Sequence, residues 1–177
     1  WVQQYTNFTR IVPPEMPELA LPERYVAVRF YFSDCFPDTE DNRALARSVL
    51  TELARAGDVV SIGSSTVVDE HRDALIPELS SRVRVVDHML TPATNLAVQT
   101  AVLSRASAFV GTYGGFSYLA PLCGVDTVAF YSDANFYEHH LDFAQQTFAR
   151  VGGGSLTVID TAVRDLVARA ARFTAET

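Results

Sequence analysis

Six short apolar runs, separated by stretches with helical periodicity, constrain the fold of this chain more than any other feature. The runs are Tyr25–Phe32, Asp58–Gly63, Arg82–Asp87, Ala106–Gly111, Val125–Tyr131 and Leu156–Asp160. Runs that are apolar throughout are typical of strands buried on both faces, as in a parallel sheet covered by helices on both sides. They predict a doubly wound, Rossmann-like α/β domain with the strand order 3-2-1-4-5-6.

The stretches between the runs have the caps and periodicity of helices. Asp38 or Thr39 is a suitable N-cap for an amphipathic helix that ends near Gly57. Further helices are predicted over Asn95–Arg105, Phe116–Cys123, Glu138–Ala149 and Thr161–Ala175. A polar loop over Ser64–Arg72 and a short helical piece join the second run to the third. Each helix returns the chain to the edge of the sheet where the next parallel strand begins.

The chain of 177 residues has the length of one domain with a substantial core. Residues 1–24 are rich in proline and show no periodicity, which predicts a linker or arm leading in from a preceding segment. Residues 25–177 are predicted to form the Rossmann-like domain. The first residue is Trp1 and not Met, which is compatible with a trimmed chain or an excised domain.

The net charge of −7 argues against a nucleic-acid partner, because phosphate backbones require basic surfaces. All 14 basic residues are arginine, so any anion site must use arginine, histidine or backbone amides. Cys35 and Cys123 are too few for a disulfide framework or a zinc site. No run approaches the roughly 18 to 20 apolar residues of a membrane span, and we find no signal-type segment. These features predict a cytoplasmic protein without a transmembrane segment.

The segment Gly111-Thr112-Tyr113-Gly114-Gly115-Phe116-Ser117, which we call the glycine turn, joins the fourth run to the helix that follows it. Ligands of open parallel sheets bind beyond the carboxyl ends of the strands, and the start of a helix presents unpaired amides to anions. Its glycines allow close approach of a ligand, and Thr112 and Ser117 add hydroxyls. The turn lacks a lysine and follows the fourth strand, which excludes P-loop chemistry. It predicts a site for a nucleotide diphosphate; the alternative is a plain glycine-rich turn.

Two charged residues near the first run are candidates for chemistry. Arg29 lies inside an apolar run, where a charge is costly unless it is paired or reaches the strand end. It is either a pyrophosphate clamp or half of a structural ion pair. Asp34 follows in the next loop, where it orients Arg29, contacts a ligand, serves as a base or caps a turn.

The remaining candidates lie in loops after other strands. His139, beside Glu138 and His140, is a candidate for contact with a phosphate, ribose or sugar hydroxyl, although a surface position fits equally well. Adjacent histidines on a helix point in different directions, so no metal site is predicted there. The Asp69-Glu70-His71 cluster is predicted to be solvated. Near Asp87, three residues are candidates for flanking a nucleotide base: His88, Met89 and Leu90. Tyr113 is the aromatic residue of the glycine turn best placed to contact a ligand.

The stretch NLAVQTAVLSRASAFVGTYGGFSYLAPLCGVDTVAFY, Asn95–Tyr131, resembles the C-terminal donor half of GT-B glycosyltransferases, most of all the heptosyltransferase type. YVAVRFY, with Arg29 inside it, is similar to the strand that opens the donor domain of some fucosyltransferase-like enzymes. The resemblance implies a domain that binds a nucleotide-diphosphate sugar without a tightly bound metal or cofactor. The diphosphate would lie on Thr112, Gly114, Gly115 and Ser117. Arg29 would offset its charge and stabilise the leaving diphosphate, and the base would lie near His88–Leu90.

This chain also departs from the family. The family often has a histidine in the helix after the glycine turn, where this chain has Tyr118. No half that would bind a glycan or other hydroxyl acceptor is visible, which predicts a preceding acceptor domain. Two alternatives stay open: a GT-B-like sugar-nucleotide epimerase using Asp34, Glu138 and His139, and a non-catalytic nucleotide- or glycan-binding module. A dinucleotide oxidoreductase is weaker, because the loop after the first strand has no glycine.

Overall fold

A parallel sheet forms the centre of the fold in the computed structural model, which describes residues 6–64, 72–74, 81–136 and 138–161. Its strands are β1 (Val26–Arg29), β3 (Val59–Ser61), β5 (Val83–Val85), β6 (Ala108–Thr112), β7 (Thr127–Tyr131) and β8 (Leu156–Asp160). Their order is β5-β3-β1-β6-β7-β8, and every neighbouring pair is parallel. Numbered along the chain, this is the order 3-2-1-4-5-6, so the predicted topology is confirmed.

The direction of winding reverses between β1 and β6. Val26 of β1 pairs with Val59 of β3 on one side and with Ala108 of β6 on the other. The chain proceeds outward from β1 to β3 and β5, then returns to the centre and proceeds the other way through β6, β7 and β8. Because the loops leaving β1 and β6 diverge at this point, they leave a crevice at the carboxyl edge of the sheet.

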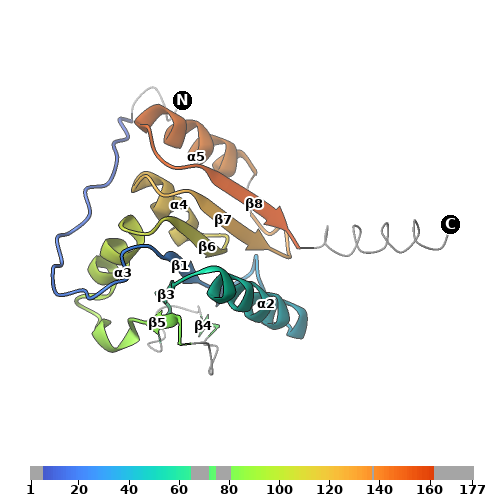
Figure 1. Cartoon of the computed structure of the whole chain (residues 1–177). Coiled ribbons are helices and arrows are strands. Elements are labelled where there is room, and N and C mark those ends of the chain that lie inside the picture. The colour runs from blue at the N-terminus through green and yellow to red at the C-terminus, as the bar shows by residue number, and fades with distance from the viewer. Residues whose placement is uncertain (1–5, 65–71, 75–80, 137, 162–177) are drawn as a thin grey trace.

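Helices cover both faces of the sheet, as Figure 1 shows, which confirms the doubly wound α/β class. The helices are α2 (Glu40–Ala56), α3 (Asn95–Ser104), α4 (Gly115–Leu122) and α5 (Glu138–Val151), with a 3-10 turn η1 over Asp87–Met89. On one face, α2 packs its apolar side chains with Val28 and Val110. On the other, α3 and α4 pack around Phe109, and α5 packs with Ala129.

The caps of α2 are those that the sequence predicts. The Thr39 side chain accepts a hydrogen bond from the Asn42 amide at 3.2 Å, and Gly57 follows the last helical residue. The other described helices begin within one residue of their predicted starts and end within two residues of their predicted ends. Capping residues and periodicity thus located these helices without tertiary information.

The first apolar run is divided, so the prediction of one strand over Tyr25–Phe32 is wrong. Val26–Arg29 forms β1, whereas Tyr31–Phe32 leaves the sheet as β2 and pairs antiparallel with β4 (Arg72–Asp73). Both halves of the run are apolar because both are buried, so hydropathy does not mark the point of departure. The Asp69-Glu70-His71 cluster, the short helical piece before Arg82 and the helix over Thr161–Ala175 lie outside the described residues.

Residues 6–22, a proline-rich segment, run in an extended path along one side of the domain (Figure 1). The Ile11 amide donates to the Leu122 carbonyl at 2.9 Å, and the Arg10 guanidinium donates to the Cys123 carbonyl at 3.0 Å. These two contacts satisfy carbonyls at the end of α4. Leu19 is buried in the same core cluster as α3. In the described ranges, no helix has the length and apolar character needed to cross a membrane.

Candidate functional site

A cavity of about 580 Å³ opens at the crevice between the loops that leave β1 and β6. Tyr31, Asp34 and Cys35 line it from the side of β1, and Tyr113 lines it from the end of β6. Further polar groups come from Ser33 and Asp38, from Arg72 of β4, and from Asn135 in the loop after β7. The rule for open parallel sheets places a ligand at this position. Of the residues predicted for the site, Asp34 and Tyr113 border the cavity directly.

The glycine turn lies next to this cavity and leads into α4. The Gly114 amide donates to the Ser117 hydroxyl at 3.0 Å, and that hydroxyl donates to the Gly114 carbonyl at 2.7 Å. Ser117 is fully buried, so its hydroxyl caps the helix and does not face solvent. Gly114 has φ of 154°, a conformation that favours glycine.

Tyr31 occupies the open side of the glycine turn. Its hydroxyl accepts a hydrogen bond from the Gly115 backbone, and a methyl group added at Gly114 would collide with it. Burial, partly countered by the nearby Arg29 charge, raises the pKa of the Tyr31 phenol to about 12. The neutral phenol oxygen therefore lies where an oxygen of a bound phosphate would accept a hydrogen bond from the same Gly115 amide.

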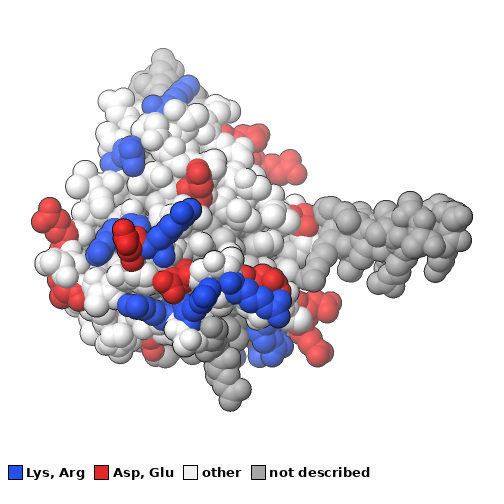
Figure 2. Space-filling view, in the orientation of Figure 1, with Lys and Arg blue, Asp and Glu red and all other residues white. Residues whose placement is uncertain are grey.

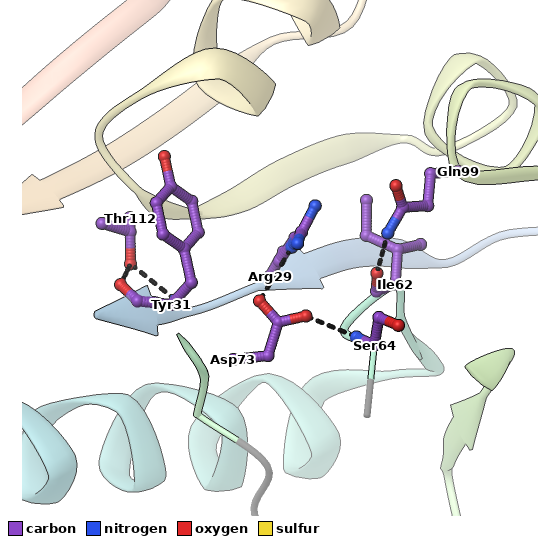
Figure 3. Close-up of polar contacts among 7 residues, drawn as sticks. All are labelled: Arg29, Tyr31, Ile62, Ser64, Asp73, Gln99 and Thr112. Atoms are coloured by element: carbon purple, nitrogen blue, oxygen red, sulfur yellow. Dashed lines mark hydrogen bonds and ion pairs between the residues drawn. The ribbon is translucent and has the colours of Figure 1, made fainter. Parts of the chain in front are cut away.

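Thr112 holds Tyr31 in this position. Its hydroxyl accepts from the Tyr31 amide and donates to the Tyr31 carbonyl, both at 3.0 Å (Figure 3). Thr112 is fully buried. Thr112 thus lies at the predicted place in the turn, but its hydroxyl is engaged within the fold. What the turn offers to an anion is backbone: the Phe116 amide forms no hydrogen bond among the described residues.

Arg29 forms an ion pair, which was the structural alternative for this residue. Its Nε lies 3.0 Å from an Asp73 carboxylate oxygen, and the other carboxylate oxygen accepts from the Ser64 amide (Figure 3). The side chains of Arg29 and Asp73 are 13% and 4% exposed. The guanidinium also lies over the Phe116 ring, 4.4 Å from its centroid. Its two Nη groups make no hydrogen bond within the described ranges.

Sequence reasoning missed Asp73 and Gln99. Gln99 is 1% exposed and donates to the Ile62 carbonyl at 2.8 Å, which ties α3 to the end of β3. Asp73 lies 44 positions from its partner Arg29 in a stretch without apolar periodicity. For Gln99, the sequence did hold a signal: a glutamine inside an otherwise apolar helix pattern. For Asp73, no feature of the neighbouring sequence distinguished it from a solvated aspartate.

The chemistry-bearing side chains of the cavity differ in their availability. Asp34 is exposed and forms no ion pair or hydrogen bond with any described residue. The Cys35 thiol contacts the Asn135 carbonyl at 3.4 Å. Burial, then the charges of Asp34 and Asp133, raise the pKa of Cys35, so it is a protonated, weak nucleophile at neutral pH. The Tyr113 hydroxyl is hydrogen-bonded to the Tyr118 hydroxyl, and burial raises the pKa of Tyr113.

The other predicted residues do not border the cavity. Leu90 is buried in the core cluster beneath α3, and Met89 packs against that cluster. His88 is exposed on η1, and His139 is exposed on α5 with its ring centroid 4.5 Å from that of His140. Within the described part of the chain, no group of three or more His, Cys, Asp or Glu residues gathers as metal ligands would.

Charges of both signs are mixed on one face of the molecule (Figure 2). Figure 2 shows arginine side chains forming a band across the lower half of one face, with aspartate and glutamate side chains among them. In physiological salt, exposed charges more than about 8 Å apart are largely screened from one another. The face in Figure 2 therefore does not present a broad field of positive charge.

Comparison with known proteins gives a distant similarity. No protein-family profile matches the chain, and no curated protein matches it in sequence. Among solved structures, it is similar to the beta Kdo 2,4 transferase KpsC of Thermosulfurimonas dismutans, with a TM-score of 0.46 and 15% sequence identity. The similarity covers 67% of this chain and 37% of that transferase, so the chain spans well under half of the protein it matches.

Proposed function

We propose that this chain is the donor domain of a glycosyltransferase, which binds a nucleotide-diphosphate sugar and stabilises the leaving diphosphate. The observation that carries the proposal is the cavity of about 580 Å³ at the reversal point of the sheet, bordered by the glycine turn. This is where open parallel sheets bind nucleotides. The resemblance of Asn95–Tyr131 to GT-B donor domains supports the same assignment.

The diphosphate is proposed to lie at the start of α4. The Phe116 amide has no hydrogen-bond partner among the described residues, and the Gly115 amide donates to the phenol of Tyr31. The dipole of α4 is positive at this end. The Arg29 guanidinium lies over Phe116 with its Nη groups unpaired among the described residues. Phosphate oxygens accept hydrogen bonds from such a set, and the terminal nitrogens of arginine match them well.

In the proposed transfer, the bond between the anomeric carbon and the diphosphate oxygen breaks, and its electron pair stays on the diphosphate. The acceptor hydroxyl oxygen forms the new bond to the anomeric carbon and gives its proton to a base. The amides of α4 and Arg29 stabilise the negative charge that develops on the diphosphate. Asp34, whose carboxylate has no partner in the described part of the chain, is the proposed base within this chain. The acceptor, a glycan or other hydroxyl compound, is proposed to bind on a preceding domain.

A thermal-shift panel of UDP, GDP, ADP, CMP and NAD tests the proposal. We expect one nucleoside diphosphate to stabilise the protein by about 2.7 kcal/mol at a concentration 100 times its dissociation constant. In a protein of this size this raises the melting temperature by roughly 5 to 11 °C. The corresponding nucleotide-sugar, incubated with the protein, should then release the nucleotide. Stabilisation by NAD and by none of the diphosphates would refute the proposal, and stabilisation without turnover would favour a non-catalytic binding module.

Replacing Tyr31 by phenylalanine is expected to raise the affinity for that nucleoside diphosphate about fivefold. The substitution removes the phenol oxygen from the Gly115 amide and leaves the ring in place. A phosphate oxygen of the ligand then no longer has to displace the hydrogen bond between the Gly115 amide and the phenol, which is worth about 1 kcal/mol. Isothermal titration calorimetry of both proteins measures the difference.

Tyr25→Phe is the matched control for this measurement. Tyr25 is another buried tyrosine next to β1, and its hydroxyl donates to the Val102 carbonyl at 2.6 Å, away from the cavity. Its loss should change stability and leave nucleotide affinity within twofold. If Tyr31→Phe binds the diphosphate more weakly than the unaltered protein, the phenol contacts the ligand and does not compete with it.

A further inference from the structure

We propose that the cavity at the reversal point of the sheet binds a neutral, hydroxyl-rich ring, with Asp34 and Asn135 as its polar contacts. The phosphates lie outside it, at the start of α4. This inference rests on the proposed function and divides the ligand between two neighbouring places. The site residues predicted from the sequence share only Asp34 and Tyr113 with its lining.

The walls of the cavity suit a sugar ring. Three of its lining residues are aromatic: Tyr31, Phe32 and Tyr113. Tyr113 is held by its hydrogen bond to Tyr118 and by the Phe136 ring, with the Tyr113 and Phe136 centroids 4.7 Å apart. Fixed aromatic rings offer apolar surface to the C–H groups of a ring at little cost in conformational entropy.

The polar groups of the cavity are available to hydroxyls. The Asp34 carboxylate and the Asn135 side-chain amide make no hydrogen bonds with described residues, and both residues are exposed. Ser33, which also lines the cavity, has a buried hydroxyl oxygen without a hydrogen-bond partner among the described residues. Buried polar atoms are nearly always satisfied in folded proteins, so an orphan oxygen beside a cavity points to a hydrogen-bonding occupant.

The charge of the lining favours a neutral occupant over a phosphate. Asp34 and Asp38 contribute two carboxylates and Arg72 one guanidinium. Asp38 is already paired with Arg43 at 2.5 Å, which leaves one carboxylate, Asp34, and one guanidinium, Arg72, among the described lining residues, so these charges sum to zero. Burial, and then the charges of Asp34 and Asp133, raise the pKa of the Cys35 thiol, so both carboxylates act on the part of the cavity beside Cys35. A carboxylate repels a phosphate but accepts hydrogen bonds from sugar hydroxyls.

The two places are adjacent because Tyr31 belongs to both. Its ring lines the cavity, and its hydroxyl reaches the Gly115 backbone at the start of α4. One nucleotide-sugar therefore spans both places, with its phosphates on one side of Tyr31 and its sugar on the other. A separate glycan in the cavity would make the same contacts as the sugar of a nucleotide-sugar. The experiments below distinguish these two ligands.

The test compares binding of UDP, GDP and ADP with binding of UDP-glucose, GDP-mannose and ADP-glucose by calorimetry. We expect Asp34→Asn and Asn135→Ala each to weaken nucleotide-sugar binding about tenfold and to change diphosphate binding less than twofold. Asp133→Asn is the matched control: it removes a carboxylate that also acts on Cys35 but does not line the cavity, and it should change neither affinity. Equal losses for diphosphate and nucleotide-sugar, or no loss for either, would overturn the inference.

Alkylation of Cys35 reports occupancy of the cavity directly. Cys35 lines the cavity, whereas Cys123 is buried elsewhere and serves as an internal reference in the same mass spectrum. A bound nucleotide-sugar should slow the reaction of Cys35 with iodoacetamide at least fivefold, and the diphosphate alone should not. If neither ligand binds, the proposed function fails, and glucose, mannose and galactose are tested in the same way. Protection of Cys35 by such a sugar, lost in Asp34→Asn, would assign the cavity to a separate glycan; the absence of any protection would refute it.

Discussion

Replacing Asp73 by alanine is expected to lower the free energy of unfolding by about 3 kcal/mol. The change leaves the Arg29 guanidinium without its counter-charge, in a place where 13% of its side chain is exposed. It also removes the carboxylate oxygen that accepts a hydrogen bond from the Ser64 amide. In a protein of this size, the loss corresponds to a melting temperature lower by roughly 6 to 12 °C. Urea denaturation followed by circular dichroism measures it.

The double variant Arg29→Met with Asp73→Ala is the control for this prediction. It removes both charges, so it should recover most of the stability that the single Asp73→Ala variant loses. The methionine side chain retains apolar contact with Phe116, over which the guanidinium lies. A single variant within 0.5 kcal/mol of the unaltered protein would mean that the Arg29–Asp73 pair does not support the fold.

The same double variant separates the two functions assigned to Arg29. If it is stable but no longer binds the nucleoside diphosphate, Arg29 contacts the phosphates in addition to its pairing with Asp73. If it binds as well as the unaltered protein, Arg29 is structural and the clamp assignment is wrong. The result is independent of the cavity residues, because Arg29 does not line the cavity.

Replacing Thr112 by valine is expected to cost about 3 kcal/mol, although the two side chains have the same shape. The Thr112 hydroxyl is the acceptor for the Tyr31 amide and the donor to the Tyr31 carbonyl, and Tyr31 is 7% exposed. Valine leaves both backbone groups buried without this partner, at about 1 to 3 kcal/mol for each. Differential scanning calorimetry measures the change.

Thr112→Ser retains the hydroxyl and is the matched control, with an expected cost of about 1 kcal/mol for the lost methyl group. The sequence alone suggested that this hydroxyl contacts a diphosphate. A Thr112→Val protein that keeps its stability but loses diphosphate affinity would support that reading and contradict the structural role that its hydrogen bonds indicate.

The arrangement of the sheet could be predicted because it depends on patterns that are local in the sequence. The four inner strands, β1, β3, β6 and β7, are short and mostly apolar runs. Each described helix has its own periodicity, and Thr39 adds a hydrogen-bonded N-cap to α2. Right-handed crossovers between parallel strands then leave few possible orders. The split of the first run at Phe30 was not predictable, because it depends on the partner of Tyr31–Phe32, which is β4 and lies 40 positions further along the chain.

The sequence alone determined that this chain folds into a doubly wound parallel sheet and that a glycine turn at its carboxyl edge leads into a helix. It also showed that the cationic groups available to an anion are arginines and histidines. Only the tertiary structure decided how those residues are used: Asp73 engages Arg29, Tyr31 engages the Gly115 amide, and Thr112 holds Tyr31. Strand and helix patterns repeat within a few residues, whereas these hydrogen bonds and ion pairs join groups 44 to 84 positions apart, where no local periodicity records them.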